Sequence, residues 1–155
     1  MTSPLQEFQA EAARKCAANL EAALLRVPEE KRAWSPAETA RTALDQVAEC
    51  AILNGSTADL IESRVWPAAS NDFEAYRRRK EELARDWSAV KAMLDANTER
   101  MTAAIRAVPD ADLGVQIEMP WGPMTLAEII AYPQWNMTYH EGQINYIASI
   151  LGCLD

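Results

Sequence analysis

His140 is the single histidine of the chain, and its neighbours include groups that could take part in chemistry. It lies in the stretch NMTYHEGQINYIASILG, residues 136–152, beside Glu141 and Gln143 in an otherwise apolar helical pattern. An imidazole can bind a metal ion, transfer a proton, or serve as a hydrogen-bonded core residue. Which of these applies depends on the other side chains that the fold brings to His140.

Three cysteines, Cys16, Cys50 and Cys153, offer a second kind of chemistry. Their number is odd and no two of them have CxxC spacing, which favours reduced thiols over a disulfide. A catalytic cysteine–histidine pair would require Cys50 to lie near His140. Nothing in the sequence would lower the pKa of Cys50, so we interpret it as a small apolar core residue.

Composition argues against several classes of partner. The chain has 155 residues and a formal net charge of −8, whereas nucleic acids and anionic membranes attract basic surfaces. The run RRRKEE, residues 77–82, has acidic neighbours and is interpreted as a solvent-facing helix surface rather than a binding patch. The sequence shows neither an apolar leader nor a stretch long enough to span a membrane, so we expect a cytoplasmic protein.

Apolar side chains recur at helical spacing in four segments, which must position these residues. They predict helices at about residues 4–26, 39–54, 71–108 and 126–151. The first helix is expected to bury a stripe made of Leu5, Phe8, Ala12, Cys16, Leu20 and Leu24. The pattern predicts an all-α fold, a single four-helix bundle that forms one domain over residues 1–155.

Local signals predict where these helices end. Asn54-Gly55 is expected to end the second helix, with a short extension towards residue 65 as an alternative. Thr125 and Glu128 have the spacing of a capping box at the start of the last helix. Pro133 is expected to kink or interrupt that helix, because proline lacks the backbone donor that a helix interior uses.

The last helix resembles a known family. The stretch PWGPMTLAEII followed by WNMTYHEGQINYIASILG is similar to the final helix of the DinB-like (damage-inducible protein) superfamily of four-helix bundles, which typically reads His-x-x-x-His-x-Gly-Gln. The turn Trp34-Ser35-Pro36, followed by Gln46-Val47-Ala48, resembles the start of that family's second helix. The resemblance covers the whole chain in length and helix order, and it is specific in the last helix.

The resemblance implies where a metal site would lie. Metal-binding members hold a divalent ion with three histidines, and the matching positions here are Gln46, Asn136 and His140. Only His140 matches, and amides are poor ligands for zinc or nickel. We therefore expect no metal cofactor, with weakly bound Zn or Ni as the alternative. Glu49 is the one carboxylate whose helical position could complete such a site, whereas Asp45 and Glu141 should point away from it.

In place of a metal site, we expect a polar network in which Gln46, Asn136 and His140 satisfy one another by hydrogen bonds. Gln143 is interpreted as a structural hydrogen-bonding residue, and Gly142 as a position of close helix packing. The best candidates for lining a pocket are Trp121 and Trp135, which lie close to His140 in the chain.

The resemblance also implies two functional hypotheses. The favoured one is a metal-free binding or structural bundle that acts as a homodimer, with a small molecule as a candidate ligand. The alternative is a metal-dependent enzyme, either a thiol-dependent transferase or isomerase or a hydrolase, that uses the cleft around His140. The number of histidine ligands favours the first hypothesis.

Overall fold

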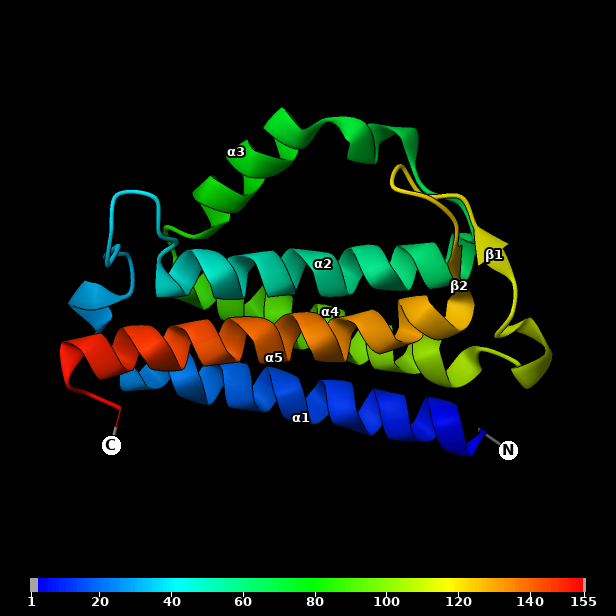
Figure 1. Cartoon of the computed structure of the whole chain (residues 1–155), viewed down its shortest axis with the longest axis horizontal. Helices are drawn as coiled ribbons and strands as arrows, with labels where there is room; N and C mark the ends of the chain where they lie inside the picture. Colours follow the sequence, from blue (N-terminus) through cyan, green and yellow to red (C-terminus); the bar gives the residue numbers. More distant parts are fainter. Residues whose placement is uncertain (1–2, 155) are drawn as a thin grey trace.

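Four long helices lie side by side in the computed structural model, which describes residues 3–154 (Figure 1). They are α1 (Pro4–Arg26), α2 (Ala43–Ser63), α4 (Trp87–Ala107) and α5 (Leu126–Leu151). Both α1 and α2 pack against α4 and α5, so that α1 lies diagonally across the bundle from α2. The predicted all-α four-helix bundle is confirmed. Across residues 3–154, none of the helices combines the length and the apolar character needed to cross a membrane.

The buried face of α1 differs from the predicted stripe. Its buried residues are Gln6, Ala10, Ala13, Ala17, Leu20, Ala23 and Leu24. Leu5 and Phe8 are 42% and 63% exposed, and only Leu20 and Leu24 of the predicted stripe are buried. The alanine-rich face lets α1 approach α4 and α5 closely, because the distance between packed helices depends on the side chains at the contact. Leu5 and Phe8 therefore face outwards, while Leu20 and Leu24 remain in the core.

α2 runs without a break past Asn54-Gly55, so the predicted end of the helix is wrong. The Asn54 side chain is buried and donates a hydrogen bond to Thr98 of α4 at 3.1 Å. A Cβ atom at Gly55 would lie 2.6 Å from Nδ2 of Asn97, so glycine gives Asn97 the room it occupies. Asn54 and Gly55 therefore lie in the contact with α4 and do not end α2. The helix ends at Ser63, and the following residue, Arg64, caps it with a left-handed φ of 59°.

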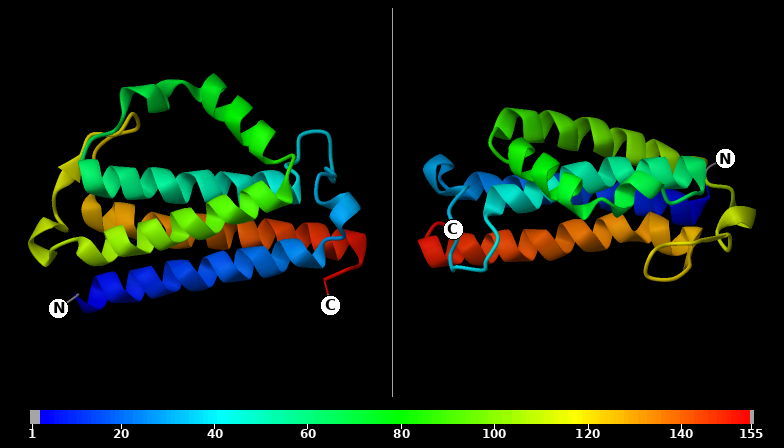
Figure 2. Two further views of the ribbon diagram at one scale, coloured as in Figure 1. Left: turned by 180° about the vertical axis from the view of Figure 1, so that it is seen from behind. Right: turned by 90° about the horizontal axis from the view of Figure 1, so that it is seen from above.

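The predicted long third helix is two helices. α3 (Phe73–Leu83) lies outside the four long helices, on the α2 side, and α4 begins after Asp86, whose side chain accepts a hydrogen bond from the backbone of Ser88 (Figures 1 and 2). Every residue of α3, all of which the structure describes, is at least partly exposed. The sequence FEAYRRRKEEL is too polar to join the core, so the chain leaves the bundle here.

α5 follows a short antiparallel pair of strands, β1 (Gln116–Ile117) and β2 (Met124–Thr125), which was not predicted. The capping box between Thr125 and Glu128 is confirmed, because each side chain accepts a hydrogen bond from the other residue's backbone. Pro133 lies inside α5 without interrupting it. Proline removes one backbone hydrogen bond, and the Pro133 side chain is buried here.

Candidate functional site

His140 is buried on α5 and faces α2. Its Nδ1 atom lies 2.8 Å from Oε1 of Gln46 and 3.2 Å from Oε1 of Gln143, while its Nε2 atom lies 3.0 Å from Oε1 of Glu49. Gln46 and Glu49 stand three residues apart on α2, so both reach the same side of that helix. Each ring nitrogen lies within hydrogen-bond distance of a side-chain oxygen, and the imidazole is therefore engaged on both sides by side chains of this chain.

Glu49 connects the imidazole to two cations. Its second oxygen, Oε2, lies 2.8 Å from Nη1 of Arg41 and 3.7 Å from Nζ of Lys80. Burial by itself would raise the pKa of Glu49, but the hydrogen bond from His140 and the positive charges of Arg41 and Lys80 lower that pKa to about 2. Glu49 is therefore a carboxylate at neutral pH.

Asp45 completes a cluster around Glu49. Its carboxylate lies 2.6 Å from Nε of Arg41 and 3.2 Å from Nζ of Lys80. Burial would lower the pKa of Arg41, but the neighbouring Glu49 and Asp45 raise it above its usual value. We call Arg41, Asp45, Glu49, Lys80 and His140 the ion-pair cluster. The expectation that Asp45 would miss the site holds for contact with the imidazole but is wrong for this cluster.

Arg41 and Lys80 are the residues that sequence reasoning missed. Asp45 and Glu49 lie one turn apart on α2, and Arg41 comes just before the N-cap residue Thr42. The four-residue spacing of these three charged residues could have revealed Arg41. Lys80 belongs to the run RRRKEE, in which Arg77–Arg79 are exposed as predicted. The Lys80 side chain is only 14% exposed, so the prediction of a wholly solvated run is wrong at this residue.

Asn136 lies one turn before His140 and is buried, but its contacts are not the predicted ones. Its amide nitrogen donates to Sγ of Cys50 at 3.6 Å, and its oxygen accepts from the hydroxyl of Tyr132 at 3.5 Å. The predicted three-way network of Gln46, Asn136 and His140 is therefore wrong in its Asn136 part. Asn136 bonds at the level of Cys50, one turn further along α2 than Gln46.

Cys50 and two tyrosines stay neutral beside the ion-pair cluster. Burial raises the pKa of the Cys50 thiol well above its usual value, so the thiolate that a cysteine–histidine pair would need is disfavoured. Burial, together with the negative charge of Glu49, also raises the pKa of Tyr76 on α3 and of Tyr132 on α5. Both phenols remain hydrogen-bond donors.

Other candidates from the sequence lie elsewhere. Trp121 packs edge-on against Trp66, and Trp135 stacks on Tyr139 with ring centres 5.7 Å apart. Both candidate tryptophans are more than 60% exposed, on the outside of the molecule. Gly142 is exposed, and a Cβ atom there would meet nothing within 4 Å, so its predicted role in helix packing within this chain is wrong.

The donors around His140 do not fit a zinc or nickel ion. They comprise one imidazole, the carboxylate of Glu49 and the amides of Gln46 and Gln143, and the carboxylate already pairs with cations. A divalent ion would have to displace these contacts and remain close to the positive charges of Arg41 and Lys80. Within residues 3–154, no three His, Cys, Asp or Glu side chains are arranged to hold a metal ion.

Comparison with known proteins identifies relatives by family and by fold. The family model described as the DinB superfamily matches residues 12–144. The crystal structure of YjoA, a DinB-like protein from Bacillus subtilis, resembles this chain with a TM-score of 0.67 at 12% identity, over 93% of this chain and 92% of that chain. At this identity the likeness concerns the fold. Comparison with curated proteins finds no match.

Proposed function

Because the chain belongs to the DinB superfamily, we propose that it is a member that works without a bound metal, as a binding or structural bundle. The observation that carries this proposal is that both nitrogens of the His140 ring already contact side chains of this chain. Its Nε2 atom contacts Glu49, whose other oxygen contacts Arg41. The nitrogen and the carboxylate that would serve best as ligands are thus engaged with groups of the chain itself.

The charges of the ion-pair cluster support the same proposal. Two carboxylates, Asp45 and Glu49, face two cationic side chains, Arg41 and Lys80. Carboxylates that lie together need positive charge nearby, which a divalent ion could supply. Here Arg41 and Lys80 supply it. We also propose a cytoplasmic location, which the free thiols of the three cysteines support.

A metal-binding experiment tests the proposal. We expect elemental analysis of the unmodified protein, purified without added metal, to find far less than one zinc or nickel per chain. Replacement of two amides in the double variant Gln46→His/Asn136→His should create affinity, because it supplies three imidazoles with His140. Isothermal titration should show binding at least about tenfold tighter than in the unmodified protein.

The matched control is the same double variant with His140→Ala, which should lose the new affinity. Stoichiometric zinc or nickel in the unmodified protein would overturn the proposal, and Glu49 would then be the ligand to replace. The metal-dependent enzyme would in that event become the better hypothesis. A double variant that binds no metal would instead show that Gln46 and Asn136 do not correspond to the family's ligand positions.

A further inference from the structure

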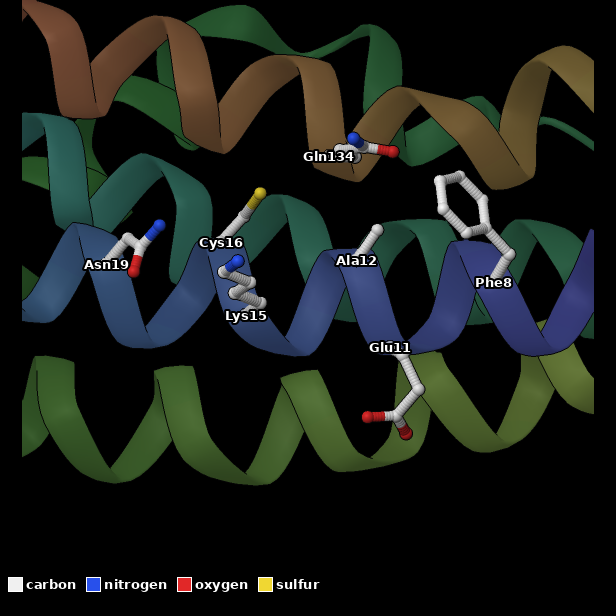
Figure 3. Close-up of a pocket in the computed structure, with 7 residues that line it drawn as sticks. All are labelled: Phe8, Glu11, Ala12, Lys15, Cys16, Asn19 and Gln134. Atoms are coloured by element: carbon white, nitrogen blue, oxygen red, sulfur yellow. The ribbon is translucent and has the colours of Figure 1, made fainter.

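His140 is closed off from solution. Only 3% of its surface is exposed, and side chains of α2 contact both nitrogens of its ring. A groove of about 540 Å³ does open between α1 and α5, where Phe8, Cys16 and Gln134 belong to its lining (Figure 3). None of the residues that line this groove belongs to α2 or α3, so the groove does not lead to Glu49. Access to His140 therefore requires part of the structure to move.

The segment between α2 and α4 is attached to the core near its two ends. It spans residues 64–86 and includes α3, in which Tyr76, Lys80 and Leu83 are partly buried and every other residue is exposed. These three positions are four and three residues apart, so they form the inner face of the helix. Trp66 packs against the core near one end of the segment, and Leu83 packs against it near the other.

Lys80 fastens the middle of this segment to α2. Its ammonium group lies 3.2 Å from Oδ1 of Asp45 and 3.7 Å from Oε2 of Glu49. Both carboxylates also contact Arg41, at 2.6 Å and 2.8 Å. If Lys80 moves away, Arg41 still pairs with both carboxylates, so the loss of the ammonium group is tolerable.

Tyr76 extends the segment towards α5. Burial and the negative charge of Glu49 raise the pKa of Tyr76 and also that of Tyr132, which places Tyr76 of α3, Glu49 of α2 and Tyr132 of α5 near one another. Tyr132, Asn136 and His140 recur every four residues along one face of α5. The segment therefore lies over the contact between α2 and α5 in which His140 is buried.

The burial of Ile52 indicates that the segment also covers the outer face of α2. Ile52 follows Asp45 by seven residues, about two turns, so both lie on the side of α2 that meets α3. Ile52 is 3% exposed, yet it is not part of the contiguous hydrophobic core that the described residues form. α3 runs back towards the start of α2 (Figures 1 and 2), which displaces Tyr76 along α2 from Asp45 towards Ile52.

We propose that residues 64–86 are a lid that is held shut by Lys80 and controls access to the His140 site. Opening breaks two partly exposed ion pairs and leaves the core packing of the four long helices in place. The lid should therefore open at a lower free energy than the whole bundle unfolds. In the closed state Lys80 is an autoinhibitory contact, which a ligand must displace. This inference goes beyond the proposed function, because the lid operates whether or not a metal binds.

The first test places a thiol beneath the lid. Ile52→Cys is made in a chain that also carries Cys16→Ser and Cys153→Ser, so that the buried Cys50 is the one native thiol left. In the native protein the introduced thiol should be labelled at least about tenfold faster than Cys50, because the lid opens without unfolding of the bundle. Intact-mass spectrometry of this variant and of its parent chain separates the two rates. Equal rates would overturn the proposal.

The second test removes the ammonium group. Lys80→Met, which keeps most of the side-chain length, should speed labelling of the introduced thiol at least about fivefold and leave the rate at Cys50 unchanged. Added salt should speed labelling in the chain with Lys80 but not in Lys80→Met, since salt screens ion pairs. The matched control is Arg78→Met, because Arg78 is exposed and pairs with Glu74 of its own helix, and its rates should stay unchanged. Lys80→Met with no effect, or with the same effect on both thiols, would overturn the proposal.

The third test asks whether the lid controls access to the site. His140 is the single histidine, so acylation of histidine by diethyl pyrocarbonate in a chain without a histidine tag reports on this ring alone. Mass spectrometry of its peptide should show a reaction at least about fivefold faster in Lys80→Met than in the unmodified protein or in Arg78→Met. In denaturant all three should react alike.

An unchanged rate at His140 in Lys80→Met would show that α3 moves without opening the site, and it would overturn the proposal. None of these measurements involves a metal ion. Failure of the lid is therefore distinguishable from failure of the proposed function, which the metal-binding experiment decides.

Discussion

Glu49 connects the imidazole of His140 on α5 to the two cations of the ion-pair cluster, Arg41 and Lys80. One oxygen contacts His140, and the other contacts Arg41 and Lys80. Removal of this carboxylate leaves Arg41 and Lys80 with Asp45 as their carboxylate partner in the cluster and takes away the oxygen that Nε2 of His140 contacts, which is more damaging than the loss of an exposed ion pair. A substitution of Glu49 therefore measures how much the ion-pair cluster contributes to the free energy of unfolding.

We expect the free energy of unfolding to decrease as the pH is lowered, because Glu49 takes up a proton at low pH and then loses its ion pairs. Its pKa lies at about 2 in the folded chain and at about its ordinary value of 4.5 in the unfolded chain. A lowered pKa contributes stability that is present above pH 4.5 and is lost as the pH falls towards 2. Glu49→Gln should lower the free energy of unfolding by about 2–4 kcal/mol at pH 7. Urea unfolding between pH 7 and pH 2 measures this difference.

The difference between the unmodified protein and Glu49→Gln should shrink as the pH falls from 4.5 to 2. Glu38→Gln, which changes an exposed glutamate, is the control and should alter stability by no more than about 0.5 kcal/mol at any pH. A difference that stays constant from pH 7 to pH 2 would contradict the lowered pKa of Glu49.

The helical spacing of the site residues could be read from the sequence, but their partners could not. The spacing of Asn136 and His140 placed both on one face of α5, and the family resemblance placed Gln46 opposite them. Glu49 follows from Gln46 by helical position. Lys80 has no signal of its own, because its contact with Asp45 depends on how α3 returns to the bundle. From the sequence alone, a lysine in a charged run is predicted to be exposed to solvent, because the position of α3 against the bundle is not known.

At the scale of elements, α3 is joined to the bundle by ion pairs and, at its end, by Leu83, which packs against the core. Its residues are all at least partly exposed, and Lys80 provides its ion pairs to α2. Sequence periodicity predicted one long helix here because α3 and α4 are both helical and only three residues separate them. Apolar periodicity predicts which residues are helical, but it does not predict where the chain changes direction between two helices.

We expect Lys80→Met to loosen α3 while the four long helices stay intact. Loss of the ammonium group removes both ion pairs from α3 to α2, whereas Arg78 is exposed and pairs with Glu74 of its own helix. Hydrogen exchange should become at least about fivefold faster for amides of α3 in Lys80→Met, a cost of about 1 kcal/mol. Arg78→Met should leave these rates unchanged. Equal rates in both variants would show that Lys80 does not hold α3.

At the scale of the whole molecule, the three cysteines differ in how deeply they are buried in the bundle. All three are free; Cys50 is fully buried, and Cys16 and Cys153 are partly exposed. Cys16 was expected in the core, and the rotated packing of α1 is the reason that it lies outside. A stripe of apolar residues predicts that a helix packs, but the small side chains of α1 decided which face is buried.

Thiol labelling of the native protein should distinguish these depths. Cys16 and Cys153 should react readily, whereas Cys50 should react at least about a thousandfold more slowly, because it becomes accessible only when the bundle opens. Mass spectrometry of labelled peptides measures the three rates. In denaturant, all three should react alike. Fast labelling of Cys50 in the native protein would contradict its burial between α2 and α5.

The exposure of α3 has a consequence for how this protein can change over time. One side of the His140 site, represented by Tyr76 and Lys80, belongs to a helix that buries none of its residues, all of them described by the structure. Substitutions in residues 73–82 therefore change the packing of the core little, whereas Leu83 at the end of α3 packs against the core. Substitutions in α3 can therefore change the surroundings of His140 while the four long helices keep the packing that folding needs. Recognition and folding can accordingly evolve separately in this chain.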